Sequence, residues 1–148
     1  MDIWKFQRDL SRVLGFWGLM NMIGGLLLVA GSGLTSNKRI RIAEIGFQSV
    51  GWGMVNALIA YFGFRSSQKK EANLPNPLDE DVQHRESKNL RRLLLINTGL
   101  DVLYSLGGAS LIWKGDRNHP QIAGHGVGII IQAVFLFFFD LFHAARLD

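Results

Sequence analysis

The chain has 148 residues, of which 48% are hydrophobic and only 19% are charged, and its formal net charge at pH 7 is +4. It has no cysteine, which excludes disulfides, thiolate metal sites and cysteine nucleophiles. The positive charge does not indicate nucleic-acid binding, because the Lys and Arg residues lie at the ends of apolar segments, where membrane topology places them. Apolar residues grouped in long blocks, as here, are typical of a membrane protein.

Before the first block, Ile3, Phe6, Leu10 and Val13 recur at three- and four-residue spacing among charged residues. This pattern predicts either a helix lying in the membrane interface or extra turns of the first transmembrane helix. The apolar run that follows is too long for a cleavable signal peptide, so we expect it to stay in the protein.

Four apolar blocks are long enough to cross a bilayer, because a hydrocarbon core of about 30 Å needs about 20 apolar helical residues. Short polar connections after the first and third blocks predict two antiparallel hairpins. We therefore expect one all-α domain, residues 1–148, folded as a four-helix transmembrane bundle. The expected crossings are residues 13–34, 42–64, 93–113 and 122–142, with a cytoplasmic loop at 65–92.

The loop contains Pro75 and Pro77, which interrupt a helix, and the acidic residues after them predict that the third helix begins near Asp79. Basic residues predict the orientation. The N-terminus, this loop and the C-terminus together hold eleven Lys and Arg residues, and the two short connections hold five. This asymmetry predicts a multi-pass protein with both termini in the cytoplasm.

The two hairpins resemble each other weakly in sequence. An offset of 80 residues aligns Asn21 with Asp101, and the AEIG of residues 43–46 with the AGHG of residues 123–126. Two similarly oriented hairpins would form a parallel internal repeat, related by an axis along the membrane normal.

Each expected crossing carries one polar residue at a similar depth, about 12 to 15 Å from the cytoplasmic end at a helical rise of about 1.5 Å per residue. The four residues are Asn21, Asn56, Asp101 and Gln132. An ionised Asp101 would cost about 2.5 to 3.5 kcal/mol at the centre of a lipid-facing helix, so we expect it to face protein or water. The layer predicts either an interhelical clamp or a site for a proton, an ion or a small solute, and the sequence leaves both open.

Three further residues are secondary candidates for the same site. Asn97 and Tyr104 lie on the same helix face as Asp101, at i−4 and i+3. Asp140 lies near the cytoplasmic end of the last crossing, where an ion pair with Arg91 or Arg92 is expected.

Glu44 and His125 fall near the opposite surface and could pair. They have no companions at metal-ligand spacing, so we expect no metal and no cofactor.

Two motifs carry a resemblance to a known family. Asn-x-Gly-Leu-Asp-x-x-Tyr runs from Asn97 to Tyr104, and Gln-x7-Asp runs from Gln132 to Asp140. With these motifs the chain resembles a family of small bacterial four-helix integral membrane proteins of unknown function. The resemblance implies a bacterial inner (plasma) membrane location and assigns no activity. The chain departs from the family pattern at Ala133, where a glycine is expected, and in GHG, where an aromatic residue is expected.

Two classes of function remain. The first is a structural or interaction subunit that binds a second copy or a larger membrane complex through its Phe-rich last crossing. The alternative is a minimal transporter for a proton, an ion or a small solute that uses Asp101. We do not expect an enzyme, because the sequence has no recognisable nucleophile, metal or cofactor motif. The expected partners are therefore the lipid bilayer and other membrane proteins, not nucleic acid.

Overall fold

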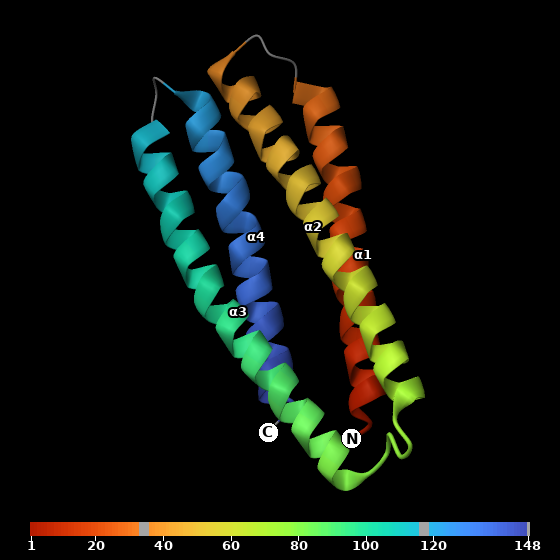
Figure 1. Cartoon of the computed structure of the whole chain (residues 1–148). Helices are drawn as coiled ribbons and strands as arrows, with labels where there is room; N and C mark the ends of the chain where they lie inside the picture. Colours follow the sequence, from red (N-terminus) through yellow and green to blue (C-terminus); the bar gives the residue numbers. More distant parts are fainter. Residues whose placement is uncertain (33–35, 116–118, 148) are drawn as a thin grey trace.

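A computed structural model of the chain describes residues 1–32, 36–115 and 119–147. It contains the helices α1 (Ile3–Ser32), α2 (Asn37–Asn73), α3 (Glu80–Gly115) and α4 (Pro120–Ala145), and the described residues include no strand. The prediction of an all-α, four-helix fold is confirmed. Both termini and the α2–α3 connection lie at one end of the bundle, here called the terminal end (Figure 1). The opposite end, where α1 leads to α2 and α3 leads to α4, is called the far end.

The helix ends follow from local sequence. Ser36 caps α2, since its side chain accepts a hydrogen bond from the backbone N–H of Arg39 at 3.4 Å. Asp79 caps α3, because its carboxylate accepts backbone N–H groups of the first turn at 3.1 and 3.4 Å. The predicted start of the third helix is therefore confirmed. Most of the segment 65–92 is helical, and only residues 74–79 separate α2 from α3.

The seam between α1 and α2 is made of small residues that recur every seven positions and are buried. A Cβ atom on Gly25 would lie 2.5 Å from the carbonyl oxygen of Gly46, and one on Gly18 would lie 2.7 Å from that of Gly53. Only glycine permits such close approach of two helices. The row comprises Ser11, Gly18, Gly25 and Ser32 on α1, and Gly46, Gly53, Ala60 and Ser67 on α2.

The seam between α3 and α4 has the same seven-residue spacing but includes two carboxylates. A Cβ atom on Gly126 would lie 2.5 Å from the carbonyl oxygen of Gly108, so the far half of this hairpin is also closed by glycines. The buried row comprises Leu94, Asp101, Gly108 and Gly115 on α3, and Gly126, Ala133 and Asp140 on α4, with Leu147 just after the end of α4. Asp101 and Asp140 thus lie between the helices of the hairpin, as expected for acidic residues excluded from an apolar surface.

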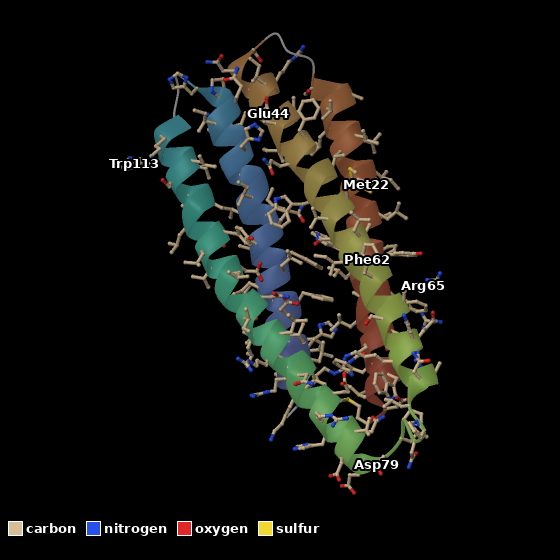
Figure 2. All side chains as sticks on the ribbon, viewed as in Figure 1. Met22, Glu44, Phe62, Arg65, Asp79 and Trp113 are labelled. Atoms are coloured by element: carbon tan, nitrogen blue, oxygen red, sulfur yellow. The ribbon has the colours of Figure 1, made fainter. Side chains whose placement is uncertain are left out.

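The two hairpins join mainly through α2 and α4, whereas α1 and α3 contact each other sparsely. Gly128 on α4 makes this join close, since a Cβ atom there would lie 2.5 Å from the Cβ of Gln48 on α2. Glu44 and Trp113 lie toward the far end, and Arg65 and Asp79 lie toward the terminal end (Figure 2).

Large apolar side chains cover the outside of the bundle, and the interior is mostly small or polar. Phe62 and Trp113, for example, are 63% and 83% exposed. By length and composition α1, α3 and α4 can each cross a membrane. Of the described helices, α2 does not reach the same hydropathy; its expected crossing includes Glu44, Gln48 and Asn56.

A second core closes the terminal end. Trp4 is fully buried, and its indole Nε1 donates to the carbonyl oxygen of Pro77 at 2.8 Å. The hydroxyl of Ser67 donates to the backbone carbonyl oxygen of Trp4 at 3.3 Å. Since α1 is continuous from Ile3, the N-terminal residues form extra turns of the first helix. They face protein rather than a membrane interface.

Candidate functional site

All four residues of the predicted polar layer are buried. Their exposed fractions are 9% for Asn21, 1% for Asn56, 3% for Asp101 and 0% for Gln132. Burial alone does not make them one hydrogen-bonded layer, and the contacts divide them into two groups.

The first group connects α1 to α4. The side-chain amide of Gln132 donates to the side-chain oxygen of Asn21, and the indole Nε1 of Trp17 donates to the side-chain oxygen of Gln132 at 3.2 Å. Asn21 also donates to the carbonyl oxygen of Trp17 at 2.8 Å. The Trp17 ring stacks on Phe135 with 3.7 Å between ring centroids. This network satisfies its amides and can act as a clamp between the hairpins.

The second group consists of Asn56 and Asp101. The side-chain nitrogen of Asn56 and Oδ2 of Asp101 are buried, and neither has a hydrogen-bond partner in the described part of the chain. One turn farther toward the far end, Trp52 meets Tyr104 edge to face, with 5.5 Å between the ring centroids. This contact places Asn56 and Asp101 at the same level on α2 and α3. They are thus a donor and an acceptor without partners among the described residues.

Asp140 belongs with Asp101. The side chain of Asn97 hydrogen-bonds the carboxylate of Asp140, and Asp101 lies close enough for the two negative charges to repel each other. The expected ion pair of Asp140 with Arg91 or Arg92 is thus replaced by an amide partner, because Asp140 points into the α3–α4 seam rather than toward the bundle end. Asp140 is 7% exposed.

A cavity of about 280 Å³ lies beside the carboxylate of Asp140, in the terminal half of the bundle, and all four helices line it. Asn97 and Asp140 are in its lining and are here called its floor. At its mouth, Nζ of Lys70 pairs with a carboxylate oxygen of Glu86 at 3.1 Å. The cavity is lined in part by small residues where α1 and α3 diverge, namely Ser11, Gly63, Ser66 and Ser67. The lining residues lie in the terminal half of the bundle, and glycine seams close both hairpins in the far half.

Asn97 and Asp140, two of the secondary candidates from the sequence, line the cavity. The other lining residues were not predicted from the sequence. The signal was present in α2, where Asn56, Ala60, Gly63 and Ser67 form a row of polar and small residues. Tyr104, the third secondary candidate, lies outside the cavity lining, is 44% exposed and packs against Trp52.

The predicted pair at the far end is confirmed. Nε2 of His125 lies 3.1 Å from a carboxylate oxygen of Glu44, and Nδ1 of His125 lies 2.9 Å from the amide nitrogen of Gln48. The cluster joins α4 to α2 beside the close contacts of Gly124 and Gly128. Among the described residues, no group of three or more His, Asp or Glu side chains could hold a metal ion.

Comparisons with known proteins give a family and no activity. Neither the curated proteins nor the solved structures include a match to this chain. The model of one family of unknown function, DUF6992, matches residues 13–141, which include both carboxylates, the far-end cluster and the cavity lining except Gln7, Leu10 and Ser11. The chain belongs to the DUF6992 family.

Proposed function

We propose that this protein is a small integral membrane protein whose cavity binds a small polar solute from the side on which both termini lie. The observation that carries the proposal is the cavity of about 280 Å³ in the terminal half of the bundle, with the buried carboxylate of Asp140 in its lining and that of Asp101 close to it. The proposal is for solute binding, as a step of transport, rather than for catalysis.

The exposed apolar surface supports a membrane location. Three helices are long and apolar enough to cross a bilayer, and α2, packed against α1 and α4, would cross with them. Polar groups of α2 that face protein, as Asn56 does, are kept away from lipid. This would lower the free-energy cost of placing the less apolar α2 in the membrane. The basic residues at the terminal end favour a cytoplasmic location for it, in a bacterial inner membrane.

The unpaired groups favour a binding site over a purely structural clamp. Buried polar groups in native proteins almost always have partners, and the Asn21–Gln132 pair follows this rule. Asn56 and Asp101 do not follow it within the described residues, although the bundle buries both. A bound solute, water or proton would supply what the protein does not.

Cysteine labelling tests whether the cavity admits solutes, and the chain has no cysteine of its own. Ser11 and Ser67 are almost fully buried yet line the cavity, whereas Ser49 is similarly buried in the far half of α2. We expect a small water-soluble methanethiosulfonate reagent to label Ser11→Cys and Ser67→Cys in the folded protein, and to label Ser49→Cys only after denaturation. Protection of all three cysteines in the folded state would refute the proposal.

A second candidate, a structural or interaction subunit, is favoured by a different surface. An apolar groove of about 310 Å³ runs between α3 and α4 on the outside of the bundle. Its lining is Val102, Ser105, Leu106, Val134, Phe137 and Phe138. A helix from a second copy or from a larger membrane complex would fit such a groove. A mass corresponding to the monomer in both mild detergent and nanodiscs, with no membrane partner recovered, would count against this role.

A further inference from the structure

The charge of the cavity is concentrated at its floor. Asp140 is there, Asp101 is close enough to interact with it, and the only basic residue in the lining, Lys70, is at the mouth in an ion pair with Glu86. Asn97 gives Asp140 one hydrogen bond, which leaves acceptor capacity on the carboxylate. The floor therefore attracts positive charge and hydrogen-bond donors.

Much of the remaining lining is apolar. It includes Leu14, Ile59, Leu93 and Phe139, and the ring of Phe139 also stacks with that of Phe135 at 5.7 Å between centroids. A volume of about 280 Å³ is near the lower end of the range for small-molecule pockets, which is about 300 Å³. The shape and lining suit a compact body with one polar end.

An inorganic cation fits this lining less well. Calcium takes about six to eight oxygen ligands and magnesium about six, mostly from carboxylates, carbonyls and water. Among the described residues, no group of three or more acidic or His side chains could hold a metal ion, and most of the cavity wall offers carbon rather than oxygen. An ammonium group needs only a few acceptors, and its carbon body gains from apolar walls.

We propose that the cavity binds a small organic cation, a primary amine with a compact apolar body, with its ammonium group on Asp140 and its body against Leu14, Ile59 and Phe139. Asp101 does not line the cavity, but it lies close enough to Asp140 to strengthen the attraction for a cation there. The aromatic ring of Phe139 adds a face on which a cation or an aryl group can rest. This assignment rests on the proposed function and adds the chemical class of its solute.

Three probes of nearly equal shape test the assignment: benzylammonium, benzyl alcohol and benzoate. Binding is measured by calorimetry on the full chain in nanodiscs, with empty nanodiscs subtracted to remove partitioning into lipid. We expect the wild type to bind benzylammonium at least about tenfold more tightly than benzyl alcohol, and benzoate least. Asp140→Asn should abolish this preference, and Glu80→Gln, which removes an exposed charge at the start of α3, should retain it.

A swapped variant, Asn97→Asp with Asp140→Asn, guards against simple misfolding of the single variant. It keeps one carboxylate and one amide at the floor, so it should recover most of the preference for the ammonium probe. Equal binding of ammonium and alcohol by the wild type, or a preference that survives Asp140→Asn, would overturn the amine assignment. So would the absence of binding by any probe. If Ser11→Cys and Ser67→Cys still react with the thiol reagent, the proposed cavity function survives that failure.

Discussion

Gln132 of α4 donates its side-chain amide to the side-chain oxygen of Asn21 on α1, and so connects the two hairpins by a buried hydrogen bond. Trp17 completes the pair by donating to the oxygen of Gln132 at 3.2 Å. The same bundle leaves Asn56 and Asp101 without protein partners in its described part. One set of polar residues therefore holds the hairpins together, and the other has no part in that connection.

The clamp predicts a measurable coupling between Asn21 and Gln132. Asn21→Ala and Gln132→Ala should each lower the free energy of unfolding, and the double variant should lose less than the sum of the two. The coupling energy should be about 0.6 kcal/mol, and up to about 1.7, as for other hydrogen bonds between membrane helices. Reversible unfolding in mixed micelles measures it, and strict additivity would show that the bond contributes nothing.

The glycine seam predicts opposite outcomes for two adjacent residues. Gly25→Ala would put a Cβ atom 2.5 Å from the carbonyl oxygen of Gly46, whereas Gly24 has no neighbouring atom within 4 Å. We expect Gly25→Ala to lower the free energy of unfolding by about 1 to 3 kcal/mol. Gly24→Ala should leave stability unchanged or raise it by up to about 1 kcal/mol, because alanine favours helix. Thermal unfolding in the same detergent compares them, and equal effects would contradict this packing.

The carboxylate of Asp101 separates solute binding from a purely structural role. Asp101→Asn removes one of two neighbouring negative charges and keeps the side-chain shape, so stability should be unchanged or higher. If the site takes part in transport, flux of an amine probe or of protons into proteoliposomes should fall at least about tenfold, because an amide neither titrates nor attracts a cation. Thermal unfolding of the same samples is the control. Undiminished flux would exclude Asp101 from the path.

Trp4, in the N-terminal turns of α1, should stabilise the fold although it precedes residues 13–141, which the family model matches. Trp4 of α1 is fully buried, and its indole donates a hydrogen bond to the carbonyl oxygen of Pro77 in the α2–α3 connection. Trp4→Ala should destabilise the fold by about 3 to 5 kcal/mol, through the cavity left behind and the lost bond. Lys5→Ala, on the exposed side of the same turn, is the matched control. A small effect of Trp4→Ala in chemical unfolding would contradict this second core.

The basic residues predict that the terminal end is cytoplasmic. Gln68 at the terminal end and Ser36 at the far end are both exposed and can carry single cysteines. An impermeant thiol reagent applied to intact cells should label Ser36→Cys, and should label Gln68→Cys only after the cells are opened. The reverse pattern would invert the proposed orientation.

The sequence by itself determined the helices and the burial of their polar residues. Block length and punctuation are local properties, so the helix count and the start of α3 after Pro77 could be predicted from them. The burial of Asn21, Asn56, Asp101 and Gln132 was predictable for a similar reason, since polar residues within apolar helices must turn toward protein. The internal repeat stays a prediction.

Only the tertiary structure decided which polar residues meet. Helical rise gives the depth of a residue along its own helix, but its partner depends on how each helix is rotated about its axis. Glycine contacts such as Gly25 with Gly46 and Gly108 with Gly126 fix that rotation, and they depend on the fit of two surfaces distant in sequence. They direct Gln132 to Asn21 and Asp140 to Asn97. The cavity likewise depends on side chains from all four helices, among them the small residues Ser11, Gly63 and Ser67, which only the folded bundle brings together.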